Sequence, residues 1–475
     1  MGFHPSSFKI CSRCGTSLSK APGTLAVEPG GVRAYLARAP FPGPFQRALS
    51  MKHHLRVLLA VTVLAGCQTS NATPVTATTS APSDTVAAAP VAQPRQSFQE
   101  WLAGLRTEAL SQGIRPATFD RAFTGIQLRD RVRELDSSQP EFTRQPWQYL
   151  DSAVSDLRVR NGREKIQQNQ ALLRRVSQRS GVPTEILVAF WGIETDYGRE
   201  TGGFPVVDAL TTLAYEGRRA AYFRAELLAA LKILDSGDIA PERMSGSWAG
   251  AMGMTQFMPT IFLKHAIDED GDGRRDIWGS LPDVFGSTAK FVQANGWRTG
   301  DRWGEEVTLP ADFPYEQAEL TVSKPVSEWR RLGVRTLDGT ELAGDGNASV
   351  LVLAGASGPA FLVRDNFRAI MRYNPSTSYA LAVALLSDRM AGRPGVQGSW
   401  PRHEQALSKD ERMELQERLA TLGFEPGTAD GIVGANTRNA VRRFQKSIGV
   451  AADGFATKSL LERLRQASGV ATTAG

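Results

Sequence analysis

Apolar residues recur at intervals of three and four along much of the chain between residues 98 and 391, which is the spacing of one face of a helix. This pattern predicts helices around 98–112, 150–180, 183–197, 213–236, 282–295 and 378–391. Between residues 303 and 365 the pattern changes to alternation, in segments such as EEVTLP, AELTVS and ASVLVLAG, which predicts short strands. We therefore expect a mainly α protein with a small strand-containing subdomain.

The chain after Ser408 has a helical pattern of its own. The segment SKDERMELQERLATLGF begins with the capping-box pair Ser408 and Glu411, and its leucines form an apolar face. NTRNAVRRFQKSIG and TKSLLERLRQ predict two further short helices. Three helices in about sixty residues make a small domain with little room for a catalytic cleft.

The segment that begins at Met51 has the pattern of a secretory signal. Lys52 precedes an apolar run over 57–66, which is too short for a membrane-spanning helix. The run ends LAGC at Cys67 and resembles the bacterial lipoprotein signal, which implies cleavage before Cys67 and lipid attachment to that cysteine. Gln68 then favours the outer membrane, so we expect a protein anchored by lipid to the periplasmic face of that membrane. A short buried helix is the alternative interpretation.

These features predict a division of the chain. Because a signal lies at the start of a chain, we interpret residues 1–50 as a gene-model extension upstream of Met51, although their CSRCG could be half of a zinc knuckle. The stretch rich in Thr, Ser, Pro and Ala before residue 97 indicates a flexible tether. The expected parts are a signal peptide at 51–66, a tether at 67–96, a main body at 97–392, a linker at 393–403 and a small domain at 404–467.

Composition narrows the chemistry that the body can perform. The whole chain is formally +6, but residues 1–66 hold eight basic residues and one acid, which leaves 47 basic against 48 acidic residues, a net of −1. A near-neutral body offers no electrostatic case for nucleic-acid binding. Beyond Cys67 there is no cysteine, and only His265 and His403 follow. A histidine-rich zinc hydrolase, a Cys/His protease and a dithiol redox enzyme are therefore poorly supported, and we expect chemistry based on carboxylates.

One carboxylate, Glu194, follows directly on an apolar run in VPTEILVAFWGIETDYG. The run suits a buried helix that ends before the loop glycines, so Glu194 lies near a helix C-terminus. The helix macrodipole and the apolar neighbours both disfavour its negative form, and such an acid can hold its proton near neutral pH, as a general acid must. The alternative is an ordinary glutamate whose charge is satisfied by a partner at a helix end.

Six blocks in order resemble the membrane-bound lytic murein transglycosylase B family over roughly residues 97–392. They are GVPTEILVAFWGIETDYG, PVVDALTTLAY, GSWAGAMGMTQFMPT, DEDGDGRRDIW, NGW and RYNPSTSYALAVALL. The resemblance implies a lysozyme-like α fold, cleavage of the MurNAc–GlcNAc β-1,4 bond of peptidoglycan, and Glu194 as the catalytic acid/base. The tail, with LGF…DGIVGANTRNAVRRFQKSIGV…DG, resembles the peptidoglycan-binding module of bacterial wall enzymes. Glycan strands of peptidoglycan are thus the expected partner of a monomer.

Glycosidases ordinarily need two carboxylates. Asp196 lies two residues further along the helix and would point about 200° away from Glu194, and we interpret Asp208 as a local cap or turn residue. The family mechanism implies that the N-acetyl oxygen of MurNAc attacks C1 while Glu194 protonates the leaving oxygen. Glu194 then takes a proton from the C6 hydroxyl, which closes a 1,6-anhydro ring without any catalytic cofactor. A hydrolytic muramidase using the same glutamate and a non-catalytic wall-binding scaffold are the alternatives.

The segment GSWAGAMGMTQFMPT is suited to a cleft wall, because its glycines let the backbone approach a sugar closely. The resemblance places Ser247 and Gln256 in the glycan site. Hydrogen bonding within turns is the alternative role for both side chains.

The segment RYNPSTSY offers further groups suited to saccharides, namely Tyr373, Asn374 and Tyr379. Its alternative is an Asn-Pro turn that leads into a helix, which is compatible with binding. Tyr149 is a further substrate-binding candidate, although its block aligns loosely. Phe291 stands where the family often has tyrosine shortly before NGW, which puts one hydroxyl contact in doubt.

DEDGDGRRDIWG matches the first half of an EF-hand loop, but Gly279 replaces the bidentate glutamate at position twelve. Three acids at alternate positions repel one another without a cation. We therefore expect a structural Ca²⁺ that braces the loop, with a solvated Asp-Gly turn as the alternative. The candidate ligands are Asp268, Asp270, Asp272, the carbonyl of Arg274, and Asp283, which matches a late acidic ligand of the family.

Overall fold

The computed structural model describes residues 96–137 and 144–473, with side chains through residue 469. The predicted signal, the lipid-bearing Cys67, the CSRCG segment and the tether up to residue 95 lie outside the described residues. Within the described part, no helix is long and apolar enough to cross a membrane.

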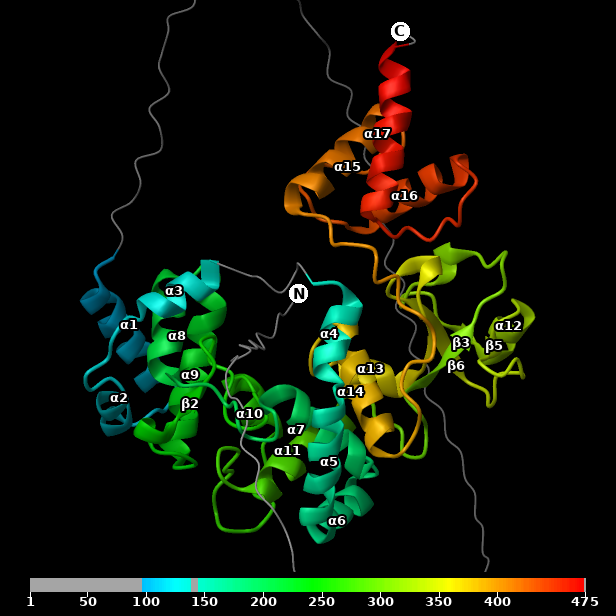
Figure 1. Ribbon diagram of the computed structural model, residues 1–475. Coiled ribbons are helices and arrows are strands. Elements are labelled where there is room, and N and C mark those ends of the chain that lie inside the picture. Colours follow the sequence, from blue (N-terminus) through cyan, green and yellow to red (C-terminus); the bar gives the residue numbers. More distant parts are fainter. Residues whose placement is uncertain (1–95, 138–143, 474–475) are drawn as a thin grey trace, which may run out of the picture. The chain divides into compact units, whose positions relative to one another are not determined.

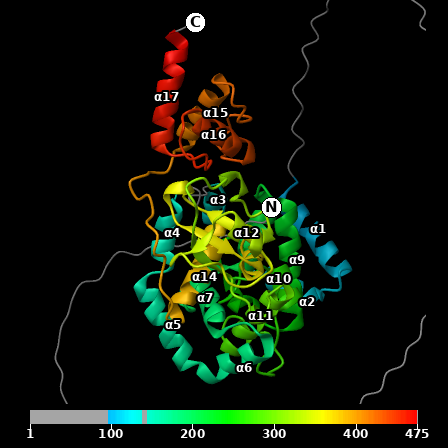
Figure 2. The same ribbon diagram turned by 90° about the vertical axis from the view of Figure 1, so that its right-hand side faces the viewer.

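The body is mainly helical, as predicted (Figure 1). Its helices pack around α7, which lies against α5, α11 and α14 in both views (Figures 1 and 2). Helices α8 and α9 pack against each other, and α10 packs against α9. The helices of the body are α1 (Phe98–Ser111), α2 (Pro116–Ala122), α3 (Asp130–Ser137), α4 (Pro146–Ala153), α5 (Asp156–Gln168), α6 (Gln170–Ser180), α7 (Thr184–Thr195), α8 (Val206–Glu216), α9 (Ala220–Ser236), α10 (Pro259–His265), α11 (Leu281–Ala294), α13 (Asp365–Met371) and α14 (Thr377–Met390).

Two of the predicted helical ranges are interrupted. The range 150–180 contains the end of α4 and the whole of α5 and α6, because Ser155 caps α5 through its side chain and Asn169 ends it. The range 213–236 breaks at Gly217, which is extended and ends α8. Capping residues and the backbone angles of single residues set these breaks. The spacing of apolar residues does not reveal either of them.

A five-stranded sheet with the order β4-β6-β7-β3-β5 forms the strand-containing subdomain, and each neighbouring pair is antiparallel. Trp329 of α12 (Val326–Arg331) and Val350 and Leu362 of the sheet form its fully buried core. Its strands are β3 (Gly304–Thr308), β4 (Lys324–Pro325), β5 (Arg335–Thr336), β6 (Asn347–Val352) and β7 (Ala360–Val363).

The strand predicted at AELTVS is wrong. Residues 318–323 form turns after the short 3-10 helix η3 (Tyr315–Gln317). The carbonyl oxygens of Leu320 and Val322 accept hydrogen bonds from the side chains of Arg368 and Ser349, so side chains take the place of a neighbouring strand. The alternation of apolar and polar residues within one segment cannot reveal hydrogen-bond partners that lie far away in the sequence.

A two-stranded sheet lies beside α8. Phe204 of β1 (Phe204–Pro205) pairs with Gly246 of β2 (Ser245–Gly246). Gly202, at φ 90°, approaches this pair so closely that a Cβ atom would come within 2.2 Å of the Gly246 carbonyl oxygen. The glycines around this segment therefore serve close backbone packing.

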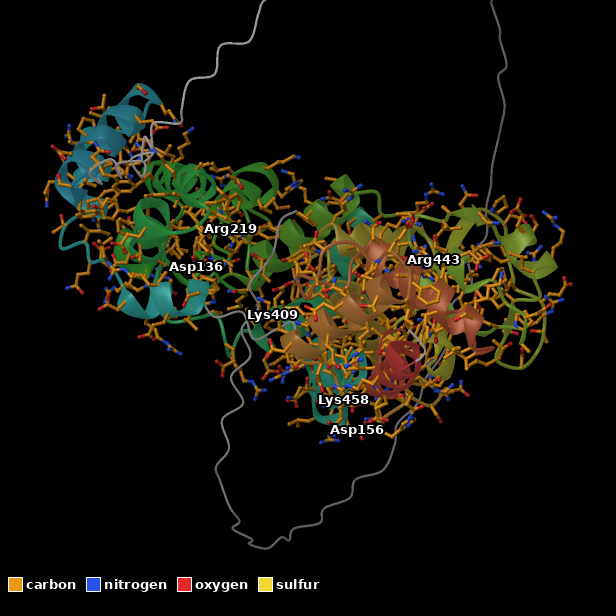
Figure 3. The ribbon with its side chains drawn as sticks, turned by 90° about the horizontal axis from the view of Figure 1, so that it is seen from above. Asp136, Asp156, Arg219, Lys409, Arg443 and Lys458 are labelled. Carbon is orange, nitrogen blue, oxygen red and sulfur yellow. The ribbon has the colours of Figure 1, made fainter. Side chains whose placement is uncertain are left out.

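The small C-terminal domain has the three predicted helices α15 (Lys409–Thr421), α16 (Ala435–Ser447) and α17 (Lys458–Thr473). The predicted capping box is present, since the backbone N–H of Glu411 donates to Ser408 Oγ at 3.1 Å and that of Ser408 to Glu411 Oε2 at 2.7 Å. The core includes Leu415, Leu419 and Phe444. Charged side chains of both signs cover the molecule's surface, for example Arg443 on α16 and Asp156 on α5 (Figure 3).

The two Asp-Gly pairs of this domain have the same structural role. Gln416 of α15 accepts the N–H of Gly431 at 2.8 Å and donates to Asp430 Oδ1 at 3.2 Å. Gln445 of α16 makes the same pair of hydrogen bonds with Gly454 and Asp453, at 2.8 and 2.6 Å. Each glutamine thus fixes the loop that leads into the next helix.

The segment 393–403 lies along the body. Glu306 of β3 accepts the backbone N–H groups of Gln397 and Gly398 at 2.9 and 2.7 Å. Further along, Arg402 forms an ion pair of 2.6 Å with Asp151 of α4. The predicted linker is therefore held by specific contacts over much of its length.

Candidate active site

The apolar run before Glu194 is a buried helix, as its pattern predicts. Helix α7 has Pro183 as its N-cap, and every residue from Ile186 to Thr195 is buried. The helix ends because Asp196 and Tyr197 both adopt positive φ, at 49° and 61°. Glu194 therefore lies in the last turn of a helix that is surrounded on all sides by packed side chains.

The reversal after α7 returns the ring of Tyr197 against the helix. Its hydroxyl donates to the carbonyl oxygen of Arg158 on α5 at 2.6 Å, and its ring covers Gly192. A Cβ atom at Gly192 would lie 2.7 Å from that ring. Tyr197 therefore fixes the end of α7. Its ring needs a residue without a side chain beneath it, which accounts for the glycine five positions earlier in GIETDY.

Glu194 is only 5% exposed, and its two carboxyl oxygens have different surroundings. Oε1 accepts a hydrogen bond from the hydroxyl of Tyr379 on α14, whereas Oε2 is buried and has no hydrogen-bond partner among the described residues. Burial raises the pKa of Glu194 to about 8, against the opposing effect of the Tyr379 hydrogen bond. At neutral pH the group is therefore mostly protonated, which a glutamate satisfied by a charged partner would not be.

Three of the predicted tyrosines gather around this carboxyl group. Tyr149 of α4, Tyr379 and Tyr373 all have a raised pKa, first because they are buried and then because the charge of Glu194 is close. Tyr373 donates to the carbonyl oxygen of Thr255, and its ring centre lies 4.8 Å from that of Phe291. The hydroxyl groups thus come from α4, α14 and the end of α13, segments far apart in the sequence.

Ser247, Gln256 and Asn374 each make hydrogen bonds within or beside their own loops. Ser247 Oγ accepts the N–H of Ala251 at 3.0 Å, and Asn374 Oδ1 accepts that of Ser376 at 3.0 Å. Gln256 Nε2 donates to the carbonyl oxygens of Thr201 and Gly253 at 3.0 and 2.9 Å. Its Oε1 has no donor within the described part of the chain, so the amide oxygen is the group of Gln256 left for a ligand.

Thr195 was not among the predicted site residues. Its hydroxyl donates to the carbonyl oxygens of Trp191 and Met254, each at 3.2 Å, and accepts the N–H of Gly198 at 3.2 Å. The residue therefore joins the end of α7 to the loop that carries Gln256. In the sequence, the indication of a role for Thr195 in the site was its position directly after Glu194.

The two other carboxylates considered from the sequence are bound by arginines. Asp196 forms ion pairs with Arg199 and, at 3.5 Å, with Arg158. Asp208 lies in the first turn of α8, but its carboxylate accepts a hydrogen bond from the distant Arg129 Nε at 2.7 Å instead of capping the helix, so the interpretation as a local cap or turn residue is wrong. In the described structure neither carboxylate contacts Glu194, which leaves Glu194 as the acid of this site.

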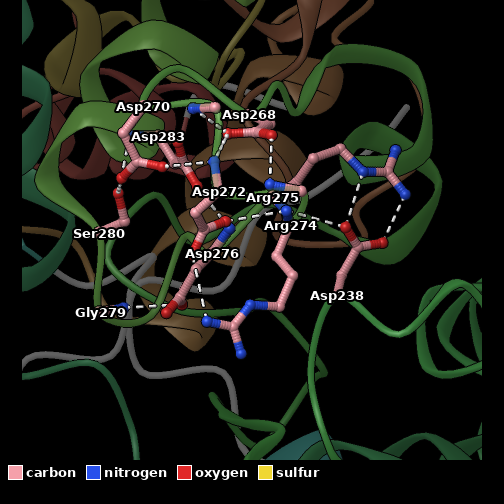
Figure 4. A network of polar contacts seen from close by, with 12 residues as sticks. Asp238, Asp268, Asp270, Asp272, Arg274, Arg275, Asp276, Gly279, Ser280 and Asp283 are labelled. Atoms are coloured by element: carbon pink, nitrogen blue, oxygen red, sulfur yellow. Dashed lines mark hydrogen bonds and ion pairs between the residues drawn. The ribbon is translucent and has the colours of Figure 1, made fainter.

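The Asp-rich loop brings three of its predicted ligands together (Figure 4). Carboxylate oxygens of Asp268, Asp270 and Asp283 all lie within 4.8 Å of one another. The pKa of Asp283 is raised to about 6, chiefly by burial and also by the charges of Asp270 and Asp268, against the opposing effect of two backbone hydrogen bonds. The three carboxylates repel one another when all are ionised, and each offers a hard oxygen ligand. Such a group suits a divalent cation such as Ca²⁺.

The candidate ligand Asp272 lies outside this group of converging oxygens, and other acids of the loop are engaged as well. The Asp272 carboxylate accepts the backbone N–H of Arg274 at 2.9 Å and forms an ion pair with its guanidinium at 3.1 Å (Figure 4). Asp276 accepts the N–H groups of Trp278 and Gly279, at 2.9 and 2.8 Å. The loop is held to α9 by Arg275, which forms an ion pair of 2.5 Å with Asp238.

Comparison with known proteins identifies the family. The family model of the transglycosylase SLT domain matches residues 97–388, and that of a putative peptidoglycan-binding domain matches residues 408–464. The chain belongs to the SLT-domain transglycosylase family. Its SLT domain is also 32% identical over 286 residues to membrane-bound lytic murein transglycosylase B of Escherichia coli K12, an alignment that covers 56% of this chain and 75% of the relative.

Solved structures of similar proteins agree with the fold of the SLT domain. SltB3 of Pseudomonas aeruginosa, in complex with NAG-anhNAM-pentapeptide, is 50% identical, with a TM-score of 0.75 over 78% of this chain and 100% of that chain. Escherichia coli Slt35 in complex with calcium is 30% identical, with a TM-score of 0.54 over 61% of this chain and 92% of that chain. The relatives of this SLT-domain protein are therefore lytic transglycosylases that act on peptidoglycan, and the predicted lysozyme-like fold is confirmed.

Proposed function

We propose that the protein cleaves the MurNAc–GlcNAc β-1,4 bond of peptidoglycan with Glu194 as its single acid/base and leaves 1,6-anhydro-MurNAc ends. The observation that carries this proposal is the buried carboxyl of Glu194, with a pKa raised to about 8 and one oxygen without a hydrogen-bond partner in the described structure. Such a group is protonated before reaction and has a free oxygen from which to deliver its proton.

In the first step the protonated Glu194 gives its proton to the glycosidic oxygen as the C1–O bond breaks. The N-acetyl oxygen of MurNAc attacks C1 and forms a cyclic cation on the sugar, which takes the place of a second enzyme carboxylate. Glu194 is then an anion, and the hydrogen bond from Tyr379 stabilises that charge. The absence of a second carboxylate at Glu194 among the described residues is thus consistent with a substrate-assisted reaction.

In the second step the Glu194 carboxylate removes the proton from the C6 hydroxyl. The C6 oxygen attacks C1, the bond to the N-acetyl oxygen breaks, and the anhydro ring closes with Glu194 protonated again. The reaction therefore uses no water and no cofactor. A hydrolytic muramidase would instead let water attack C1, and the anhydro-sugar ligand bound to the 50% identical SltB3 supports ring closure over hydrolysis.

We assign the surrounding groups to sugar binding and positioning. Tyr149, Tyr373 and Asn374 offer aromatic faces and polar groups beside Glu194, while Ser247 and the free Oε1 of Gln256 suit acetamido and hydroxyl groups of the substrate. Tyr379 acts on Glu194 itself through its hydrogen bond.

We propose that Asp268, Asp270 and Asp283 hold a structural Ca²⁺. Their oxygens converge, and the 30% identical Slt35 has been solved in complex with calcium. A bound cation would remove the mutual repulsion of the three carboxylates and brace the segment between α10 and α11. Since Asp272 is engaged by Arg274, it is the control residue for this proposal.

We also propose that the mature protein is a lipoprotein of the outer membrane, with its lipid on Cys67. The support is the LAGC sequence after a short apolar run, together with the membrane-bound relative in Escherichia coli. Expression from Met51 in a bacterium should place the protein in the membrane fraction, because lipoprotein acylation with several chains anchors firmly. A Cys67→Ala variant that fractionates like the parent would contradict the anchor.

The product tests the main proposal directly. Digestion of purified murein should release muropeptides that are lighter by one water than the hydrolytic products, and mass spectrometry distinguishes the two. Reducing ends instead of anhydro ends would establish the hydrolytic alternative.

A further inference from the structure

A cavity of about 560 Å³, lined by charged and apolar residues, lies at the end of α14, away from the residues assigned to sugar binding. Strand β3, the loop after β5 and the segment 393–397 complete its wall. The lining residues that matter here are Arg302, Trp303, Glu306, Asp338, Asp388 and Arg393.

A buried carboxylate organises this cavity. The Asp388 side chain is 8% exposed and accepts hydrogen bonds from Trp303 Nε1 at 3.1 Å, Arg302 Nη2 at 3.2 Å and Arg393 Nη1 at 2.6 Å. One carboxylate thus holds two guanidinium groups, one just before β3 and one just after α14 in the sequence. This arrangement fixes both groups before any ligand arrives, which reduces the entropy lost on binding.

Both arginines retain donors for a ligand. Their side chains are 48% and 50% exposed, and each guanidinium has five N–H donors, of which the bonds to Asp388 use one nitrogen. Two half-exposed guanidinium groups share the single negative charge of Asp388. The three groups together therefore carry a net positive charge. Planar N–H pairs of this kind recognise carboxylates.

The lining of the cavity also carries acids. Hydrogen bonds from Thr336 and Thr340 lower the pKa of Asp338, so this exposed group is an anion at neutral pH. Glu306 also lines the cavity, where its carboxylate accepts the N–H groups of Gln397 and Gly398. The cavity therefore presents cations and anions together, and it complements a ligand that carries an ammonium and a carboxylate close to each other.

We propose that this cavity binds the peptide stem of peptidoglycan at a residue whose side chain ends in an amino acid head, with an ammonium and a carboxylate on one carbon. The inference rests on the proposed function, because it takes peptidoglycan as the substrate. Arg302 and Arg393 receive the carboxylate, and Asp338 and Glu306 receive the ammonium.

The length of α14 is compatible with this assignment. Tyr379, which contacts Glu194, and Asp388 lie nine residues apart on the same helix, which corresponds to about 14 Å along its axis. An extended peptide spans about 3.3–3.6 Å per residue, so about four stem residues, or three and a long side chain, cover that distance. A stem attached to a sugar in the active site is therefore long enough to reach the cavity.

The first test needs no variant. Glycan chains of equal length should be prepared with three stems, in which the third residue is diaminopimelate, diaminopimelate with an amidated distal carboxylate, or lysine. The wild-type enzyme should cleave the first with a KM lower by roughly tenfold or more, which corresponds to one charged bidentate contact. Equal KM values for all three stems would overturn the cavity assignment but leave glycan cleavage intact. Failure to cleave any of them would contradict the proposed function instead.

The second test locates the preference on the chain. Arg393→Met should raise KM for the diaminopimelate stem to the value of the lysine stem and leave kcat and the lysine-stem KM unchanged. Arg331→Met, which changes an exposed arginine of α12 that does not line the cavity, is the matched control. An equal loss on all three stems would assign Arg393 to folding alone and would overturn the proposal.

Discussion

At the scale of single residues, burial decides the chemistry of Glu194. The helix end and the apolar neighbours were readable from the sequence, but the size of the pKa shift comes from the burial of the carboxyl in the folded body. Tyr379 works in the opposite direction, since its hydroxyl stabilises the anion. The two effects together place the pKa where one group can act first as an acid and then as a base.

The pH dependence follows from this balance. Activity should fall as pH rises through about 8, because Glu194 then loses the proton that it must donate. Tyr379→Phe removes the hydrogen bond that lowers the pKa of Glu194, so the alkaline limb of the kcat/KM profile should move to higher pH, with a lower maximum rate.

Tyr315→Phe, at a partly buried tyrosine that packs against the core of the strand subdomain, is the control and should leave the profile in place. A limb that stays or moves to lower pH in Tyr379→Phe would refute the contact as described. The linkage has a matching sign in stability: the raised pKa of Glu194 contributes stability below about pH 4.5 that is lost as pH rises through about 8.

At the scale of elements, the end of α7 is fixed by the residues that follow it. The left-handed residues Asp196 and Tyr197 reverse the chain, and the ring of Tyr197 then covers Gly192. Thr195 joins the same helix end to the loop that carries Gln256. The position of Glu194 therefore depends on the three consecutive residues that follow it.

Gly192→Ala tests this dependence. The new methyl group would lie 2.7 Å from the Tyr197 ring, and such overpacking should lower the free energy of unfolding by about 1–3 kcal/mol and reduce turnover. Gly104→Ala is the matched control, since Gly104 lies in α1 with nothing within 4 Å of an added Cβ atom. Urea denaturation measures both; no loss of stability in Gly192→Ala would contradict the close packing.

The Asp-rich loop offers a second test at this scale. Calcium added to metal-free protein should raise the Tm, because a ligand that binds only the folded state stabilises it by mass action. Asp270→Asn should abolish the shift, whereas Asp272→Asn should largely keep it, since Asp272 is paired with Arg274 instead. A Tm that is indifferent to calcium in the wild type would favour the solvated turn.

Much of the site was predictable because its signals are local. The spacing of apolar residues predicts the burial of α7 and the acid at its end. A pair of residues three positions apart predicts the capping box of α15. The partners of Asp208 and Leu320 were not predictable, because Arg129 and Arg368 lie 79 and 48 residues away in the sequence. The absent strand at AELTVS and the reassignment of Asp208 are both consequences of such distant partners.

At the scale of the whole molecule, the small C-terminal domain contacts the body through residues that take no part in the proposed chemistry. Asp453 accepts the N–H of Ala356 at 2.8 Å, and Arg442 forms an ion pair of 2.7 Å with Glu319. Both contacts are made with the strand-containing subdomain and its loops. The residues assigned to sugar binding all belong to the SLT domain.

Deletion of residues 404–475 should therefore separate binding from catalysis. Retention on insoluble murein should weaken, because a tethered second module raises the local concentration on a polymer, while cleavage of short soluble glycans should change little. Pull-down on sacculi and turnover of soluble fragments measure the two effects. An equally severe loss on soluble fragments would place the small domain within the active site.

The central claim is that Glu194 alone supplies and removes the proton, and product analysis of one isosteric variant tests it most directly. Glu194→Gln keeps the shape of the side chain but cannot transfer a proton, so the release of anhydro-muropeptides from purified sacculi should fall by about 10²–10⁴-fold. Binding to murein and the Tm should be retained. Mass spectrometry of wild-type and variant digests measures the outcome. Near wild-type release of anhydro products by the variant, or reducing-end products from the wild type, would contradict the account.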